Sequence, residues 1–352
     1  MAGPGMSWQG RSVCITGGTG FIGGALAARL AEMGAQVIVP TRDKSRIGRG
    51  SGAIRYIAAR DLAAALPGVS ALFNLAYDFR RSADENIALY AKTADACALA
   101  QVPMLVQASS IAVYDDWPLG DVTEASPCDA PGHDYKAAKR AIERDIARRV
   151  GEGQFDAVIL QPTIVYGPGS PQWADALAEK MAGGTLILPD RDDGLCNGLY
   201  IDDLVSVFIA AAELERGGAE RFIVSGPETF PWNRLLSAYA EACGASVRHE
   251  PTAPYVPRPA AKPSALSALV QRASAIAAGL IGTARLEKLR GWAMARRPGP
   301  RIWRPAAENP KLFLGTGVAS TDKMRAHLFV PQVSAEEGIA RTCAALRAKY
   351  KL

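Results

Sequence analysis

Three residues of this chain could together move a proton to or from a substrate oxygen: Ser110, Tyr135 and Lys139. Tyr135 and Lys139 are four residues apart, so on a helix they share one face, where the lysine ammonium would favour the ionised phenol. A phenol with an ordinary pKa of about 10 needs such a neighbour to exchange protons at neutral pH. Ser110 follows an expected strand and could hold the same oxygen. The triplet predicts acid/base chemistry; its alternative is a surface helix pair beside a strand-end hydroxyl.

A glycine-rich segment precedes this triplet. An apolar strand from Arg11 runs into Gly17, Gly20 and Gly23, and a helical pattern follows from Ala25. Glycines in this order allow a tight turn and let the backbone approach a pyrophosphate at a helix N-terminus. We therefore expect nucleotide binding, although a glycine-rich turn without a ligand is the alternative.

Apolar strands and amphipathic helices alternate from residue 11 to about residue 160. This pattern is typical of an α/β fold with a doubly wound parallel sheet, in which ligands bind at the carboxyl ends of the strands. The expected strands are 12–16, 36–41, 54–59, 71–76, 104–109 and 155–161, and the clearest expected helices are 84–100 and 133–150.

Taken together, these segments resemble the extended short-chain dehydrogenase/reductase superfamily, in its NAD-dependent epimerase/dehydratase-like branch. The resemblance covers almost the whole chain. The matching segments are Thr16–Gly23, Asp61-Leu62, Phe73–Ala76, Ser109–Tyr114, Leu160–Pro168, Tyr200–Leu204, Ala319–Arg325 and Ser334–Ile339.

The resemblance implies a Rossmann-type domain over 11–165, with later returns to the sheet near 195–225. A flexible tail (1–10) precedes it, and 166–352 forms mainly a smaller C-terminal α/β substrate-binding cap with an apolar and basic insert at 251–310. The implied cofactor-binding residues are Gly17, Gly20, Phe21, Ile22, Gly23, Arg42, Asp61, Leu62, Leu75, Ala76, Ser109, Tyr135, Lys139, Pro162, Ile164 and Val165.

The same resemblance implies hydride transfer between a nicotinamide ring and a carbon that bears a hydroxyl or keto group. Tyr135 would move the proton, Lys139 would lower the pKa of Tyr135 and bind the nicotinamide ribose, and Ser110 would orient the reacting oxygen. Tyr166 and Pro162 would shape the nicotinamide pocket. The chain departs from the family at Gln161, where an arginine is usual.

The residues after the second expected strand bear on the choice of cofactor. A carboxylate there suits the ribose hydroxyls of NAD, whereas an arginine suits the extra phosphate of NADP. The chain has Arg42 first, then Asp43, with Lys44 and Arg46 in the same loop. We therefore prefer NADP over NAD, with a merely solvated basic loop as the alternative.

Ile111 and Ala112 bear on the type of reaction. The 4,6-dehydratases of the family carry an Asp-Glu pair at these positions, because eliminating water needs a further acid and base. The apolar residues argue against dehydration. Epimerase and reductase or dehydrogenase both remain, since the triplet does not separate them.

The cap should select the substrate, and here the alternatives stay open. We favour a sugar or nucleotide-sugar; a hydrophobic alcohol or ketone, steroid- or isoprenoid-like, is suggested by an apolar stretch at 264–282. Basic residues interleaved with tryptophans follow it up to Arg304 and could bind a substrate diphosphate. Association of the protein with an anionic membrane surface through 264–304 is less favoured. The sequence contains no recognisable nucleic-acid-binding motif. A dinucleotide-binding sensor or scaffold without turnover is the third class.

Composition sets further limits. The chain has 352 residues, 49% of them hydrophobic, with a formal charge of +5. Six scattered cysteines and three histidines show no metal-ligand spacing, so no metal site is expected. The N-terminus shows no signal-peptide pattern, and we expect a cytoplasmic protein. Family members often dimerise through the helices expected at 84–100 and 133–150; the apolar positions that would allow a homodimer are Ile87, Leu89, Ala94, Ala98 and Ala141.

Overall fold

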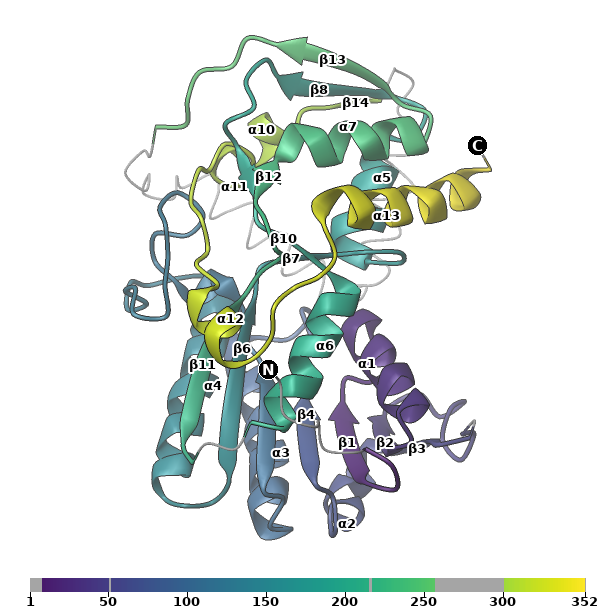
Figure 1. Ribbon diagram of the computed structural model, residues 1–352, viewed down its shortest axis with the longest axis vertical. Coiled ribbons are helices and arrows are strands. Elements are labelled where there is room, and N and C mark those ends of the chain that lie inside the picture. Colours follow the sequence, from purple (N-terminus) through teal and green to yellow (C-terminus); the bar gives the residue numbers. More distant parts are fainter. Residues whose placement is uncertain (1–7, 51, 215–216, 257–300, 352) are drawn as a thin grey trace, which may run out of the picture.

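The computed structural model describes residues 8–50, 52–214, 217–256 and 301–351, and its centre is a seven-stranded parallel sheet. The strand order is β11-β6-β5-β4-β1-β2-β3 (Figure 1). Strands β1 to β3 extend the sheet in one direction and β4 to β6 extend it in the other, so the strand order reverses between the neighbours β1 and β4, the point where such sheets bind ligands. The expected doubly wound α/β fold is confirmed. The strands are β1 (Ser12–Thr16), β2 (Gln36–Thr41), β3 (Ile54–Ala58), β4 (Ala71–Asn74), β5 (Met104–Ala108), β6 (Asp156–Pro162) and β11 (Ala219–Val224).

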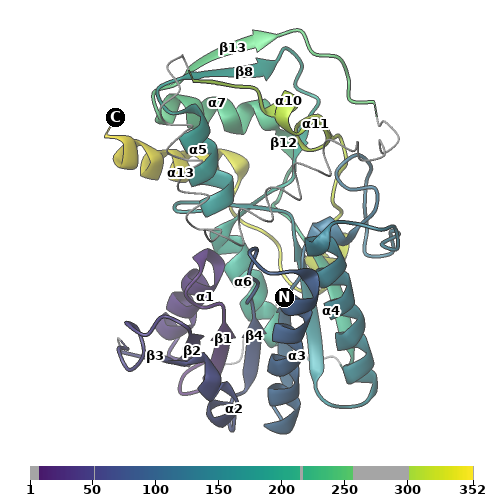
Figure 2. The same cartoon turned by 180° about the vertical axis from the view of Figure 1, so that it is seen from behind.

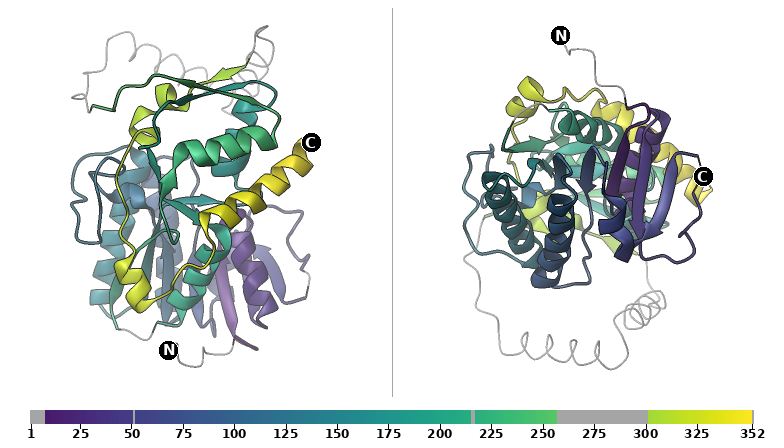
Figure 3. Two further views of the ribbon diagram at one scale, coloured as in Figure 1. Left: turned by 45° about the horizontal axis from the view of Figure 1, so that its top comes forward. Right: turned by 90° about the horizontal axis from the view of Figure 1, so that it is seen from below.

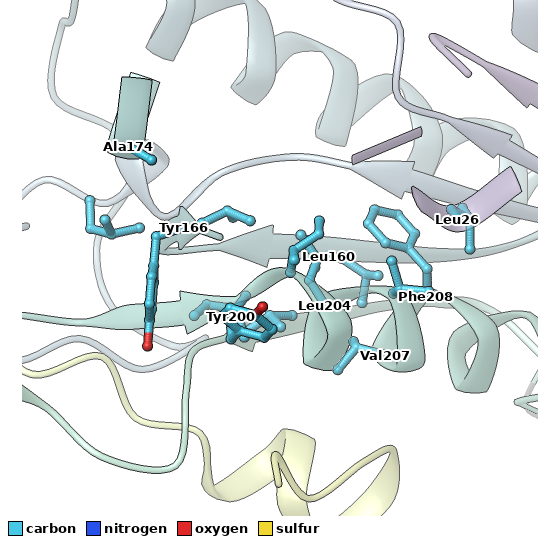
Figure 4. Packing of buried hydrophobic residues seen from close by; sticks show 14 of the residues in the cluster. Leu26, Leu160, Tyr166, Ala174, Tyr200, Leu204, Val207 and Phe208 are labelled. Atoms are coloured by element: carbon cyan, nitrogen blue, oxygen red, sulfur yellow. The ribbon is translucent and has the colours of Figure 1, made fainter. Parts of the chain in front are cut away.

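Helices cover both faces of this sheet because successive strand residues point to opposite sides. Val13 and Ile15 pack in one apolar cluster with α1 (Phe21–Glu32) and α6 (Ile201–Ala212), whereas Cys14 packs in another with α3 (Ala83–Leu99) and α4 (Asp134–Gly151). Figure 2 shows α3 and α4 on the face opposite α1, and Figure 4 shows Leu26, Leu160 and Phe208 in the first cluster. A short helix α2 (Leu62–Ala65) follows β3 after the 3₁₀ turn Ala59–Asp61.

The expected strands 12–16 and 36–41 match the observed ones, and the other expected boundaries differ by at most two residues. β4 ends at Asn74. The Leu75 N–H makes a last hydrogen bond to Thr16 O (3.1 Å), and the chain then leaves the sheet. Helix α3 begins after Ser82, which forms a capping box with Glu85. Helix α4 begins after His133, whose side chain accepts a hydrogen bond from the Lys136 N–H. Both helices are thus placed by local capping at the carboxyl end of the sheet.

The second half of the chain builds smaller sheets above this end. β8 (Thr185–Pro189) lies between β13 (Ser246–Glu250) and β14 (Ile302–Trp303); β10 (Gly198–Tyr200) pairs with β7 (Ile164–Tyr166), and β12 (Phe230–Pro231) with β9 (Leu195–Cys196). The accompanying helices are the π-helical turn Pro171–Asp175, α5 (Ala176–Met181), α7 (Trp232–Ala242), α10 (Pro305–Glu308), α11 (Pro310–Phe313), α12 (Asp322–His327) and α13 (Ala335–Tyr350). Figure 3 shows α12 beside the main sheet and α13 beside α7.

Several expectations about peripheral segments change. Trp8 is buried in the main apolar cluster and the Gly10 N–H bonds to Gly34 O (2.9 Å), so the packed chain begins before residue 11. The apolar stretch 264–282 and most of the basic cluster lie outside the described residues. Of that cluster, Arg304 is engaged in an ion pair with Glu250 (2.9 Å). Within the described ranges, no helix has the length and apolar content needed to cross a membrane.

One of the residues expected at a dimer interface points inward instead. Ala94 is completely buried in the cluster that joins α3 to α4, because this helix pair packs within one chain. Leu89 and Ala141 remain partly exposed. The homodimer itself stays a prediction.

Close packing of the glycine loop predicts a steep stability cost at one position. A Cβ on Gly23 would lie 2.4 Å from Gly17 O, whereas one on Gly24 would have Gly18 O as its nearest contact, at 3.8 Å. We expect Gly23→Ala to lower the free energy of unfolding by about 2 kcal/mol through overpacking. Gly24→Ala, the matched control, should raise it by up to about 1 kcal/mol through helix propensity. Urea denaturation checks both; equal effects of the two changes would contradict this packing.

Candidate active site

The glycine loop forms a cradle of bare backbone after β1. Gly17 has φ of +72°, and a Cβ there would lie 2.8 Å from the Leu75 carbonyl carbon and 2.9 Å from Ala76 N. Side chains would therefore fill the space between the loops after β1 and β4. Gly20, the N-cap of α1, provides no side-chain cap, which leaves the first-turn N–H groups of Phe21 and Ile22 able to bind a ligand. This arrangement fits the pyrophosphate of a dinucleotide.

A buried polar chain crosses the carboxyl ends of three strands. Thr16 Oγ1 at the end of β1 donates to Asn74 Oδ1, and Asn74 Nδ2 donates to Gln107 Oε1 (2.8 Å). Gln107 Nε2 donates to Ala108 O (2.7 Å), which also accepts from Lys139 Nζ (2.7 Å). The strand before the glycine loop is thus connected to Lys139 by side chains that sequence reasoning missed. A polar residue at successive strand ends was the only available signal.

Ser110, Tyr135 and Lys139 converge as predicted. Ser110 follows β5 and forms a hydrogen bond with the Tyr135 side chain, while Lys139 Nζ lies 5.6 Å from the Tyr135 ring centre. Lys139 is only 4% exposed, and burial lowers its pKa to about 8 although nearby Glu143 raises it. Three elements therefore bring a hydroxyl, a phenol and an ammonium group together.

The pKa of Tyr135 differs from the expectation. Burial raises it above its ordinary value and outweighs the lowering by the hydrogen bond with Ser110. Lys139 does not reverse this, because its ammonium group is held at Ala108 O and lies over the Tyr77 ring as well (5.0 Å). Without ligands, Tyr135 is therefore a protonated phenol at neutral pH, the form that can donate a proton.

Glu143, one turn beyond Lys139 on α4, is the centre of a second buried network. Its carboxylate accepts from Ser109 Oγ and from Gln161 Nε2 (3.0 and 3.1 Å), and Arg221 on β11 lies 3.7 Å away. Tyr114 donates to Gln161 Oε1 (2.7 Å). Gln161, at the position where the family usually has arginine, thus gives Glu143 a neutral hydrogen-bond donor. The positive charge near Glu143 comes from the guanidinium of Arg221 instead. The Ser109 hydroxyl, expected at the cofactor, is directed to Glu143 instead.

The other predicted cofactor residues lie around the same edge of the sheet, with differing exposure. Asp61 and Leu62 occupy the turn after β3, and Asp61 is exposed beside Arg60 (3.6 Å). Pro162 ends β6, and Ile164 and Val165 on β7 are buried. Pro162, Ile164 and Val165 can therefore offer only backbone atoms or small patches of surface to a ligand.

Tyr166 does not line an open pocket. It is 1% exposed and packs edge-on against Tyr200 and Phe230 in the core between β7 and β10 (Figure 4). The expectation that its ring shapes the nicotinamide pocket is therefore corrected. Apolar surroundings on both sides of this short strand explain its burial.

Arg42 directly follows β2, which ends at Thr41. Its guanidinium is 3.2 Å from the Asp78 carboxylate, yet its side chain is 71% exposed. Asp43, the acidic neighbour, accepts hydrogen bonds from Ser45 N (2.9 Å) and Ser45 Oγ (2.6 Å). The carboxylate that would recognise ribose hydroxyls is therefore already engaged within its own loop.

Sequence reasoning also missed two rings beside Tyr135. Tyr77 meets the Tyr135 ring edge-on, with centres 4.9 Å apart, and Phe79 stacks on it at 5.5 Å. Both belong to the loop between β4 and α3. No local pattern links that loop to residue 135, because the contact depends on the neighbouring positions of β4 and β5 in the sheet.

Comparisons with known proteins agree with this geometry. The family model described as "NAD dependent epimerase/dehydratase family" matches residues 13–225. A 3-diazoavenalumate denitrifying reductase from Streptomyces sp. is 30% identical over 254 residues, covering 66% of this chain and 82% of the relative. A 2-alkyl-3-oxoalkanoate reductase from Stenotrophomonas maltophilia (strain K279a) is 28% identical, covering 66% of this chain and 76% of its own length.

Among solved structures, MoeE5 in complex with UDP-glucuronic acid and NAD superposes with a TM-score of 0.65. The two share 20% identity, and the match covers 96% of this chain and 99% of MoeE5. At that identity, the similarity concerns the fold.

The shifted pKa values of Tyr135 and Lys139 predict how the rate of carbonyl reduction would depend on pH. Tyr135 is protonated well past neutrality, whereas Lys139 loses its proton near pH 8, so kcat/KM should fall as pH rises through about 8. Because the Glu143 charge raises the Lys139 pKa, Glu143→Gln should move this alkaline limb to lower pH. Rates of NAD(P)H oxidation from pH 6 to 10 check both expectations. A limb that stays in place in Glu143→Gln would show that Lys139 does not control it.

Proposed function

The chain belongs to the NAD dependent epimerase/dehydratase family, and we propose that it exchanges a hydride at a carbonyl or secondary-alcohol carbon, using NAD(P). The observation that carries this proposal is the convergence of Ser110, Tyr135 and Lys139 beside the glycine cradle. A sensor or scaffold without turnover would not require a buried ammonium group next to a phenol. We therefore favour an enzyme.

The chain's own residues would supply the proton and hold the reacting oxygen. When bound, the nicotinamide supplies the hydride to the carbonyl carbon in reduction and accepts it in oxidation. Tyr135 donates its phenolic proton to the carbonyl oxygen, and the Ser110 hydroxyl donates a hydrogen bond to that oxygen. Lys139 balances the negative charge left on the phenolate, and its field brings the Tyr135 pKa down during the reaction.

We propose reduction of a ketone, with release of the cofactor, as the leading reaction. The 2-alkyl-3-oxoalkanoate reductase supports this choice, since its name describes reduction of a ketone. The 3-diazoavenalumate denitrifying reductase supports reduction more generally. A dTDP-6-deoxy-L-talose 4-dehydrogenase (NAD(P)(+)) from Kitasatospora kifunensis, 30% identical over 174 residues, supports the sugar alternative instead. Epimerisation or oxidation of a nucleotide-sugar is the second candidate; the fold of MoeE5, which holds UDP-glucuronic acid and NAD, supports it. Dehydration is not proposed, because Ile111 is a buried apolar residue where an acid would be needed.

For the cofactor we propose NADP. The Arg42 guanidinium after β2 pairs with Asp78 but is 71% exposed and could contact a 2′-phosphate, while Asp43 accepts two hydrogen bonds from Ser45. An arginine at this place suits a phosphate, which it can bind by charge-assisted hydrogen bonds.

Replacing the phenol tests the proposed reaction. Tyr135→Phe should reduce turnover of any accepted ketone by about 100-fold or more, the usual share of a proton donor, and leave NADPH binding unchanged. The control is Tyr350→Phe in the last turn of α13. Initial rates over a panel of hydrophobic ketones and keto-sugars, together with fluorescence titration of NADPH, give both quantities. Equal rates for wild type and Tyr135→Phe would refute the assignment of Tyr135.

Arg42→Ala tests the cofactor preference. We expect it to weaken NADPH binding by about tenfold, because one charge-assisted phosphate contact is lost, and to change NADH binding little. Arg29→Ala on α1 is the control, since Arg29 pairs with Glu32 on the same helix. Titrations with each dinucleotide measure the difference. Equal weakening of both would mean that Arg42 does not recognise the 2′-phosphate.

A further inference from the structure

We infer that Tyr77 and Phe79 form an aromatic wall that contacts a planar, apolar substituent of the substrate carbonyl, as in an aryl or conjugated ketone. The inference rests on the proposed function, because it takes Tyr135 as the group that meets the carbonyl oxygen. It adds the substrate class, which Ser110, Tyr135 and Lys139 leave open.

The position of the aromatic wall fixes what it can contact. Phe79 stacks almost parallel on Tyr135, with an interplanar angle of 22° and ring centres 5.5 Å apart, and Tyr77 meets both rings edge-on. A substrate oxygen bonded to Tyr135 and Ser110 must lie within hydrogen-bond distance of the phenol. The groups attached to that carbonyl carbon then lie within a few ångströms of the stacked rings.

Exposure of Phe79 indicates a contact that the described residues do not complete. Its side chain is 75% exposed, whereas Tyr77 is partly buried against Tyr135 and Lys139. A phenylalanine ring has no hydrogen-bonding group, so its free face can gain only from apolar or aromatic surface. A flat conjugated ring offers that surface.

The loop that carries Phe79 is held by hydrogen bonds on both sides of it. Asn86 is 3% exposed; its side chain accepts from Asp78 N (2.9 Å) and donates to Asp78 O and Ser82 O (3.0 Å each). Asp78 also pairs with Arg42 and Arg81 (3.2 and 3.5 Å). The exposed ring is therefore presented by a fixed turn.

Two polar groups near the aromatic wall have other partners. Asp78 is engaged by the two arginines, and His133 Nδ1 accepts from Lys136 N (3.4 Å) as the cap of α4. A sugar would need several hydrogen-bonding groups for its hydroxyls. These occupied side chains favour an apolar substituent.

Calorimetric titration of the enzyme with bound NADP⁺ tests this inference. Acetophenone is the aryl probe, 2-butanone the small aliphatic probe and UDP-glucuronic acid the sugar probe. We expect acetophenone to bind more tightly than 2-butanone, and Phe79→Ala to weaken acetophenone about tenfold while 2-butanone changes little. Phe79→Tyr, which keeps the ring, should stay within about threefold of wild type.

Leu99→Ala controls for loss of an exposed apolar side chain, since Leu99 is 84% exposed at the far end of α3. Phe79 is exposed, so its variants should fold, and thermal melting confirms this. Unchanged acetophenone binding in Phe79→Ala, no acetophenone binding in wild type, or tighter binding of UDP-glucuronic acid than of acetophenone would each overturn the inference. Phe79-dependent binding without turnover would instead refute the proposed reduction and leave the aromatic wall standing.

Discussion

An ammonium group buried at the end of β5 is the constraint on which the rest of the site depends. Lys139 has almost no access to water, and its hydrogen bond to Ala108 O and the charge of Glu143 offset only part of the cost of burial. Its pKa in the folded protein, about 8, is below the ordinary 10.5. Between these two pH values the folded state binds fewer protons than the unfolded state. The destabilising effect of Lys139 is therefore complete below about pH 8 and is relieved progressively as pH rises to 10.5. The fold tolerates an amine that weakens it at neutral pH, which is typical of functional sites.

Much of the fold could be predicted from local patterns. Strand residues buried on both faces form apolar runs that alternate with amphipathic helices, and this alternation predicted the element boundaries within two residues. The glycine loop and the Tyr135–Lys139 spacing were equally local. Each requires only a few neighbouring residues, and the strand order of a doubly wound sheet then brings them together.

The rest depended on contacts between distant segments. Glu143, Asn74 and Gln107 acquire their roles only when β1, β4, β5 and β6 lie side by side. The direction of a side chain also escaped prediction: Ala94 and Tyr166 face the core, and Ser109 bonds to Glu143. The pKa of Tyr135 was misjudged for the same reason, since Tyr135 is partly buried among rings from another loop, and the cost of desolvating its phenolate exceeds the benefit of its hydrogen bond with Ser110.

The clamp at Asn86 has a consequence for how such a protein diverges. Asn86 grips the turn after β4 through main-chain atoms of Asp78, Arg81 and Ser82, and none of its bonds involves the side chains of Phe79 or Arg80. Mutations at these two positions therefore change the exposed surface of the turn while its main-chain hydrogen bonds stay in place. In a gene lineage, the side chain presented beside Tyr135 can change here without the loss of stability that usually limits change in a packed region.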